Sequence, residues 1–350
     1  MKLTPFVLSA LTIAGVAQQP QTATIEPSKD NTIYNFGTSL SNGVGTRFFC
    51  GTDLSRRNRR GLLCFVVRGY VPPLSTIQSV RLDLTVAQTT APSLNVSLHR
   101  LTSAFGESSS LAGSGQGGGA PAQQGDATWN DAFFPNTPWQ TPGGDFVPTA
   151  SATTLVASSG TFSFSSAAML TEVQNWLDQP LTAHGWIVMT DETSSPSARA
   201  FHSREATNTA LRPKLVVTYL PPVAAVQSFG TGCNGGGAQP LTRTANSVPT
   251  IPNASFALQL SGGPAAGSQI VDLFLSLLPN PIPLPIGTNC SLWGDFQTMI
   301  VGLPLSGPLP LPVPNNPNLI GVRFAAQGLA FDPVTSAFAT SNGLQVTVGV

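Results

Sequence analysis

Residues 80–86 read VRLDLTV, and residues 94–98 read LNVSL. In both segments apolar and polar side chains alternate strictly, which is the pattern of a β-strand with one buried face. Short segments of this kind recur along the chain between turns that are rich in glycine and proline. The 350 residues include 34 glycines and 31 prolines, and long charged helical patterns are absent. The sequence therefore predicts an all-β protein.

The length of the chain favours two domains over one. We expect a β-sandwich over residues 24–219, a linker over residues 220–228 (LPPVAAVQS), and a second, smaller β-sandwich over residues 229–350. One helix interrupts the strands of the first domain. It is predicted from SSAAMLTEVQNWLDQP (165–180), where apolar residues recur at helical spacing, a serine can cap the start and a proline follows the end.

The chain begins with MKLTPFVLSALTIAGVAQQPQ. One lysine, Lys2, precedes an uncharged apolar run from residue 3 to residue 16, and small residues stand just before Gln18. This is the layout of a secretory signal peptide over residues 1–17, and the run is too short to span a bilayer comfortably. We therefore expect a protein that is secreted or held at the extracellular surface, without a membrane span.

The charge composition narrows the class of partner. The formal net charge is +0, and 9% of the residues are charged. Binding to nucleic acid depends on the neutralisation of many phosphates, so this composition argues against nucleic acid as a partner.

Four cysteines stand at positions 50, 64, 233 and 290, and none has the C-x-x-C spacing of a zinc or redox site. In an exported protein we expect two disulfides, Cys50–Cys64 and Cys233–Cys290, one in each domain. The segments RFFCG and GLLCFVV around the first pair read as a hairpin whose register could bring the two thiols together. The alternative is that Cys50 and Cys64 are buried thiols on adjacent strands.

An ordered set of motifs runs through the first predicted domain: ATIEPSKDNTIYN, RRGLLCFVV, ATWNDAFFPNTPW, TPGGDF, VQNWLDQP, FHSREA and RPKLVVTY. The set resembles the DNRLRE-type secreted β-sandwich module, which is related to disaggregatase and to carbohydrate-binding-like jelly rolls. This resemblance implies that residues 24–219 form a jelly-roll β-sandwich of an extracellular protein. It also implies binding to polysaccharide or to cell-surface and matrix components. The region from Phe229, with FGTGCNGGG and TSNGLQVTVG, resembles a β-rich module at the C-termini of exported planctomycete-type bacterial proteins, and that resemblance implies no activity.

Residues 125–146 read GDATWNDAFFPNTPWQTPGGDF and pack five large aromatic rings into a run of turn-forming residues. Flat aromatic rings stack on the C–H faces of sugars, and neighbouring Asp and Asn side chains bind hydroxyl groups. The expected ligand-binding residues are Trp129, Asn130, Asp131, Trp139, Asp145 and Phe146. The alternative is that the rings bury themselves under the loop, which would make the protein a structural component of a surface or matrix.

The sequence carries no motif of a known catalytic site. The three histidines, His99, His184 and His202, belong to no G-x-S-x-G, H-E-x-x-H or P-loop motif. A glycosidase needs two carboxylates across a cleft, which Asp126, Asp131 and Asp145 could supply, but such residues more often cap turns. We expect a non-enzyme, and a polysaccharide-active enzyme is the distant alternative.

The sequence also carries two charged motifs and a set of candidate calcium ligands. RRNRR (56–60) is either a solvated hairpin tip or a contact for an anionic polymer. HSREA (202–206) predicts a local ion pair between neighbouring residues. No cofactor is predicted firmly, but a structural Ca²⁺ would need six to eight oxygens. The candidate Ca²⁺ ligands are Glu26, Asp30, Asp191 and Glu192.

Overall fold

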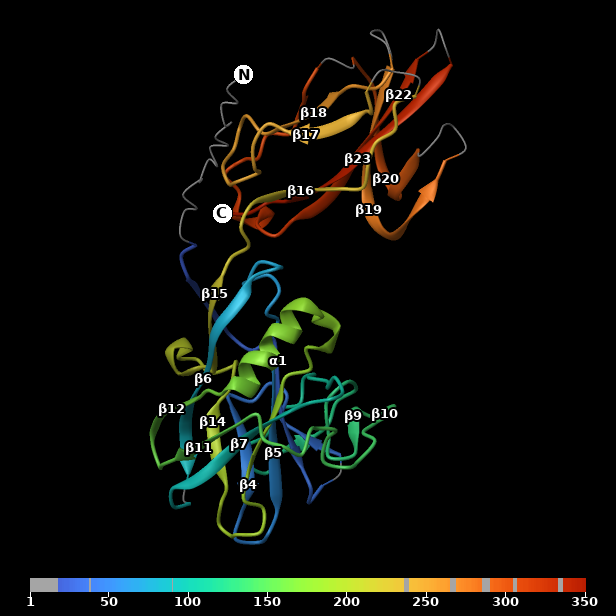
Figure 1. Ribbon diagram of the computed structural model, residues 1–350. Coiled ribbons are helices and arrows are strands. Elements are labelled where there is room, and N and C mark those ends of the chain that lie inside the picture. Colours follow the sequence, from blue (N-terminus) through green and yellow to red (C-terminus); the bar gives the residue numbers. More distant parts are fainter. Residues whose placement is uncertain are drawn as a thin grey trace, which may run out of the picture.

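The computed structural model describes residues 18–37, 39–89, 91–235, 239–264, 269–284, 290–304, 307–332 and 336–350. It is an all-β structure of large curled antiparallel sheets with smaller sheets beside them, as the sequence predicts (Figure 1). Residues 1–17, the expected signal peptide, lie outside the described residues. No helix among the described residues is long and apolar enough to cross a membrane.

The sheets form two sets, one built from residues 21–220 and the other from residues 225–347. The elements of the first set are β1 (Gln21–Ile25), β2 (Lys29–Tyr34), β3 (Leu40–Ser41), β4 (Arg47–Thr52), β5 (Asn58–Cys64), β6 (Thr76–Thr89), β7 (Leu94–Arg100), β8 (Ala120–Pro121), β9 (Asp131–Phe133), β10 (Thr137–Pro138), β11 (Ala152–Val156), β12 (Gly160–Phe164), α1 (Ala167–Asp178), β13 (Trp186–Thr190), β14 (Arg199–His202) and β15 (Lys214–Leu220), with 3-10 turns at Pro180–Thr182 and Thr209–Leu211.

The elements of the second set are β16 (Ala225–Phe229), β17 (Thr242–Ala245), β18 (Ala257–Ser261), β19 (Gln269–Pro283), β20 (Ser291–Pro304), β21 (Leu309–Pro310), β22 (Arg323–Asp332) and β23 (Ala337–Thr347), with a 3-10 turn at Pro317–Leu319. Their five-stranded sheet has the order β16-β23-β22-β19-β20, and their three-stranded sheet has the order β17-β18-β21. An apolar cluster that includes Phe256, Leu258 and Val346 draws on both sheets. Most of the predicted linker 220–228 belongs to strands, because β16 pairs along its whole length with β23.

The segment VRLDLTV lies within β6, where its alternating pattern gives one buried and one solvated face, as predicted. Leu82 and Leu84 are buried in the main apolar cluster of the first set. On the other face of the strand, Arg81 forms an ion pair with Asp83, Nε to Oδ1, at 2.9 Å. β6 pairs with β15, so that Leu82 lies opposite Leu215. The period of two in the sequence thus gives one buried and one solvated face.

The main sheet of the first set follows the path β1-β15-β6-β14-β4-β5-β13-β7-β11. β4 joins its two halves, because one end of β4 pairs with β14 and the other end with β5. Side chains from both halves meet in one core. The helix α1 packs against this core with Trp176, whose ring lies 4.5 Å from that of Trp186. The Ser166 side chain accepts a hydrogen bond from the Met169 N–H and caps the helix, as predicted.

The expected disulfide Cys233–Cys290 is present and links the segment after β16 to the segment before β20. The predicted disulfide Cys50–Cys64 is wrong, because both residues are buried free thiols. In the β4–β5 pair, Gly51 lies opposite Arg59, so Cys64 lies several residues beyond the position that faces Cys50. Cys50 also points into the main core, whereas Cys64 belongs to a second apolar cluster. Burial raises the pKa of the Cys50 thiol to about 12.

Candidate functional site

The aromatic loop 125–146 packs on the sheet face formed by β2, β5 and β13. The loop contains the small β9–β10 hairpin, which is labelled in Figure 1. Loop and sheet together build a second apolar cluster, separate from the main core. Its buried members are Ile33, Leu62, Cys64, Leu101, Phe105, Ala127, Ala132, Trp139 and Ile187, and Trp129, Phe133, Phe146 and Met189 pack against them half-buried.

Trp139 is the buried anchor of this loop. Its side chain is 4% exposed. The indole Nε1 donates a hydrogen bond to the Thr128 carbonyl at 2.9 Å, and the Trp139 N–H donates to the Asn130 carbonyl at 3.0 Å. A buried indole that finds a partner for its N–H stabilises the loop without leaving a polar group unpaired.

Two of the three carboxylates in the loop, those of Asp131 and Asp145, bind groups of the loop itself, whereas Asp126 accepts from the N–H groups of Ser108 and Gln123 outside it. Asp145 accepts hydrogen bonds from the N–H groups of Gln140 and Thr141, each at 3.0 Å. Asp131 accepts from the Thr128 hydroxyl at 3.0 Å. Asp and Asn side chains commonly stabilise turns in this way. Asp131 and Asp145 therefore hold the backbone of the loop in place.

Trp129 and Phe146 share a single cation, Arg60. The guanidinium lies 4.7 Å from the centre of the Trp129 ring and 5.5 Å from that of Phe146. It also binds both oxygens of Glu192, at 2.7 and 2.8 Å, and donates to the Gly143 carbonyl at 2.8 Å. Bidentate pairing fixes the guanidinium plane, and the two rings are attracted to it through cation–π contacts. Asn130, next to Trp129, is exposed to solvent.

The structure thus brings all six predicted binding residues into one loop region but gives them different environments. Trp139 is buried and Asn130 is exposed, while Trp129, Asp131, Asp145 and Phe146 lie half-buried. That they bind a ligand stays a prediction.

The sequence interpretation missed Arg60 and Glu192 as partners of the aromatic rings. Arg60, Leu62 and Cys64 alternate along β5, and the last two belong to the cluster beneath the loop. The alternation could therefore have placed Arg60 on the same face. Two further arginines of RRNRR, Arg57 and Arg59, pair with a single carboxylate, that of Asp53. Three arginines of the motif are therefore engaged in ion pairs within the folded chain, so the motif is not simply a solvated hairpin tip.

A second cluster of charged groups surrounds Arg204. Its guanidinium Nη1 lies 2.7 Å from Glu107 Oε1 and 3.3 Å from Glu205 Oε1, which confirms the predicted local ion pair. The Arg204 N–H donates to Asp30 Oδ2 at 2.7 Å, and the Asp30 N–H donates to Glu107 Oε2 at 3.0 Å. Burial raises the pKa of the carboxyl groups of Asp30, Glu107 and Glu205, and it raises that of Glu107 to about 7.

The candidate calcium ligands do not converge. Across the residues that the structure describes, no three His, Cys, Asp or Glu side chains gather in an arrangement that could hold a metal ion. Glu26 pairs with Arg212, and Glu192 pairs with Arg60. A structural Ca²⁺ stays a prediction.

The raised pKa of Glu107 predicts a pH-dependent stability. The folded chain keeps a proton on Glu107 up to about pH 7, whereas the unfolded chain releases it near the ordinary value of 4.5. This stabilisation is complete below about pH 4.5 and is lost as the pH rises through about 7. After allowance for solvent screening, the loss should be about 1–2 kcal/mol.

Thermal unfolding of the wild type and of Glu107→Gln between pH 5 and pH 8 measures this effect. The lowered pKa values of His184 and His202 act in the opposite direction, so the difference between the two proteins is the quantity to follow. The wild type should lose stability relative to Glu107→Gln as the pH rises. Asp178→Asn, at an exposed carboxylate, serves as the control. Parallel pH profiles for the wild type and Glu107→Gln would contradict the prediction.

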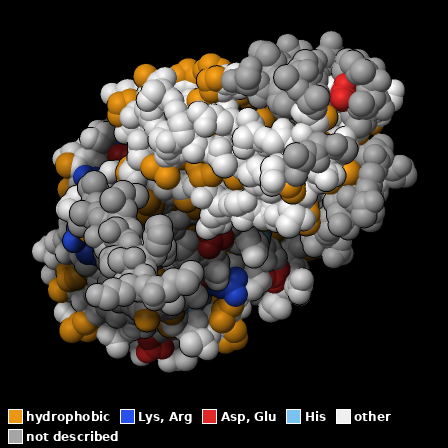
Figure 2. All heavy atoms as spheres, turned by 45° about the horizontal axis from the view of Figure 1, so that its top comes forward, with side chains coloured by type: hydrophobic (Ala, Val, Ile, Leu, Met, Phe, Trp, Pro, Cys, Tyr) orange, Lys and Arg blue, Asp and Glu red, His pale blue; other side chains and the backbone are white. Residues whose placement is uncertain are grey.

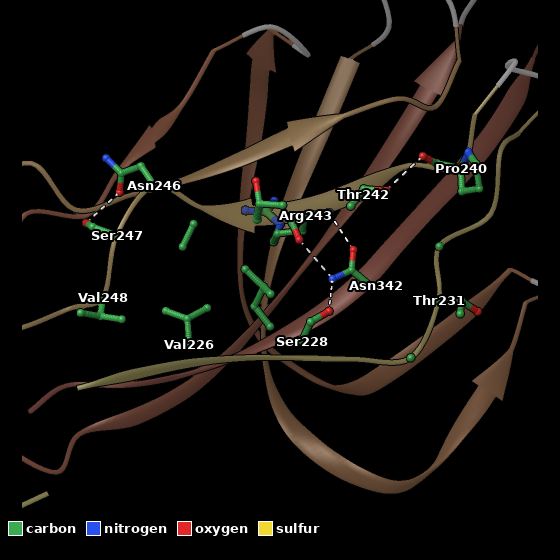
Figure 3. Close-up of a pocket in the computed structure, with 15 residues that line it drawn as sticks. Val226, Ser228, Thr231, Pro240, Thr242, Arg243, Asn246, Ser247, Val248 and Asn342 are labelled. Atoms are coloured by element: carbon green, nitrogen blue, oxygen red, sulfur yellow. Dashed lines mark hydrogen bonds between the residues drawn. The ribbon is translucent and has the colours of Figure 1, made fainter. Parts of the chain in front are cut away.

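The second set of sheets carries an open groove of about 890 Å³ between β16, β17 and β23 (Figure 3). Asn342 points across it: its Oδ1 accepts from the Arg243 N–H at 2.7 Å, and its Nδ2 donates to the Ser228 hydroxyl at 2.8 Å and to the Arg243 carbonyl at 3.1 Å. The Asn342 amide therefore takes the place of a neighbouring strand along the edge of β17. These contacts serve to join the two sheets.

On the face of the molecule shown in Figure 2, charged side chains are few and scattered among hydrophobic and uncharged ones.

No protein-family model matches the chain, and no curated protein matches it. The resemblance to the DNRLRE-type module therefore stays a prediction.

Proposed function

We propose that this chain is an exported, non-catalytic protein that binds carbohydrate or another extracellular polymer. We further propose that it does so through the loop surface at Trp129 and Asn130. The observation that carries the proposal is the Trp129 ring, which is half-buried, held over Arg60 at 4.7 Å and flanked by the exposed Asn130. An aromatic ring beside an amide is a combination that suits the apolar face and the hydroxyl groups of a sugar.

The contacts of Arg60 make this ring suitable as a platform. Glu192 and the Gly143 carbonyl fix the guanidinium, and the guanidinium in turn fixes the Trp129 ring. A ring that is already ordered loses little side-chain entropy when a ligand stacks on it. In this proposal Trp139 and Asp145 position the platform from below and do not contact the ligand.

The layout of the first 17 residues and the Cys233–Cys290 disulfide both favour export, because disulfides persist in oxidising compartments.

A structural role in a surface or matrix is the second candidate. It is favoured by the burial of Trp139 and by the internal hydrogen bonds of Asp131 and Asp145. A loop whose polar groups are already paired can serve purely to cover a sheet face. In that case the variants of the loop would change stability and no polymer would bind.

A pull-down with insoluble polysaccharides, together with a glycan array, tests the proposed function. Trp129→Ala should weaken polymer binding by about tenfold or more, which corresponds to about 1.4 kcal/mol, while the melting temperature falls by only a few degrees. Trp129→Phe keeps a ring and should retain most of the binding. Leu181→Ala, at a side chain that is almost fully exposed, is the control for a surface change. Unchanged binding by Trp129→Ala, or no binding by the wild type, would contradict the proposal.

A further inference from the structure

A polar cleft of about 490 Å³ opens on the first set of sheets, apart from the aromatic loop. Three segments that are distant in sequence form it: the β1–β2 connection at residues 26–28, the stretch after β5, and the connection between β14 and β15. The residues that matter for the argument are Glu26, Val66, Tyr70, Arg204, Glu205 and Arg212.

One wall of the cleft presents an exposed aromatic ring on an anchored turn. The Tyr70 side chain is 56% exposed, and Val66 beside it is also exposed. The turn beneath them is fixed, because the N–H groups of Tyr70 and Val71 both donate to the Val67 carbonyl at 3.1 Å. Val67 and Val71 are buried in the main core. The core therefore holds a turn that displays a large ring to solvent.

The charged part of the lining, here called the charged wall, consists of paired groups in fixed positions. Arg212 Nη1 lies 3.0 Å from Glu26 Oε2, and its Nε donates to the Ala206 carbonyl at 3.0 Å. Arg204 is held by Glu107 and Glu205. This wall therefore offers both donors and acceptors whose geometry is set before any ligand arrives.

The carboxylates of this wall are partly open to solvent. The Glu205 side chain is 20% exposed and that of Glu26 is 42% exposed. Glu205 Oε2 itself is buried without a hydrogen-bond partner among the described residues, so it is shielded from a ligand in the cleft. A ligand hydroxyl group would therefore donate to Glu26 or to the other Glu205 oxygen, which contacts Arg204.

We infer that this cleft is a second recognition site and that it takes a neutral saccharide. The C–H face of the sugar stacks on Tyr70, while neighbouring hydroxyl groups accept from Arg212 or Arg204 and donate to Glu205 or Glu26. A neutral polyol satisfies both kinds of group, whereas an anionic sugar would meet Glu26 and Glu205 and a cationic one would meet the two arginines. The inference does not depend on the Trp129 surface.

Titration of the full chain with neutral and uronic-acid oligosaccharides of matched length, followed by calorimetry or NMR, tests this inference. A neutral oligosaccharide should bind the wild type, and binding should persist at high salt because no net charge is neutralised. Tyr70→Ala should weaken this binding by about tenfold or more, and Tyr70→Phe should retain it. Glu205→Gln should weaken it less than Tyr70→Ala, because one oxygen and an amide group remain. Trp129→Ala should leave binding at this cleft unchanged, which separates the site from the one proposed above.

Three results would overturn the inference. The first is that no neutral oligosaccharide binds the wild type. The second is that Tyr70→Ala keeps its melting temperature and binds like the wild type. The third is that only uronic-acid oligosaccharides bind and are released by salt.

Discussion

Replacing Trp139 by alanine should lower the free energy of unfolding by about 3–5 kcal/mol. The indole is 4% exposed and lies among the buried side chains of the second apolar cluster, so its removal leaves a cavity. The change also leaves the Thr128 carbonyl without the Nε1–H donor that it now has at 2.9 Å. Both effects act in the same direction, because lost packing and an unpaired buried acceptor each destabilise the folded state.

Chemical unfolding of the wild type, Trp139→Ala and Trp139→Phe measures the effect and divides it. Trp139→Phe keeps most of the apolar volume but loses the donor, so it should cost less than Trp139→Ala. Trp129→Ala, at the half-buried ring, should cost only about 1–2 kcal/mol. A loss below about 1 kcal/mol in Trp139→Ala would show that the loop does not depend on this ring. The comparison is informative because the two tryptophans look alike in the sequence.

The strands and the helix of the first set could be predicted because their signals are local. The alternation of VRLDLTV predicts the buried Leu82 and Leu84 of β6, and the spacing in SSAAMLTEVQNWLDQP predicts the buried Trp176 of α1. Each pattern depends only on neighbours along the chain, which is the information that a single sequence contains.

Features that depend on register were beyond the sequence. The Cys50–Cys64 pairing required a particular alignment of β4 with β5, and the alignment in the structure sends the two thiols to different clusters. A shift of one residue exchanges the faces of a strand, so a plausible hairpin does not fix which side chains meet.

The candidate sites show the same limit. The composition of residues 125–146 drew attention to the right loop, but it could not say that Arg60 and Glu192 would hold the Trp129 ring. HSREA and Glu26 were noted in the sequence, but nothing there connected them with each other or with Tyr70, because the cleft is lined by residues near 26, 70 and 205. A site whose side chains come from three distant segments leaves no local pattern in the sequence, because only the folded topology brings these side chains together.

Replacing both Cys233 and Cys290 by serine should destabilise the second set of sheets by about 4 kcal/mol, because the disulfide closes a loop with a sequence separation of 57 residues. Both side chains are buried in a small apolar cluster, so two hydroxyl groups would add a burial cost to the gain in unfolded-state entropy. Calorimetry should then show lower stability in the part of the chain that contains β16–β23.

The bridge can be checked separately by thiol titration in denaturant, where the wild type should show two free thiols, those of Cys50 and Cys64. Four free thiols would mean that the bridge is absent, and an unchanged melting profile in the double variant would mean that the sheets do not need it. Cys64→Ala, which removes a free thiol, should leave the second set unaffected. A loss confined to the disulfide variant would therefore show that the small sheets beyond residue 225 depend on a covalent link.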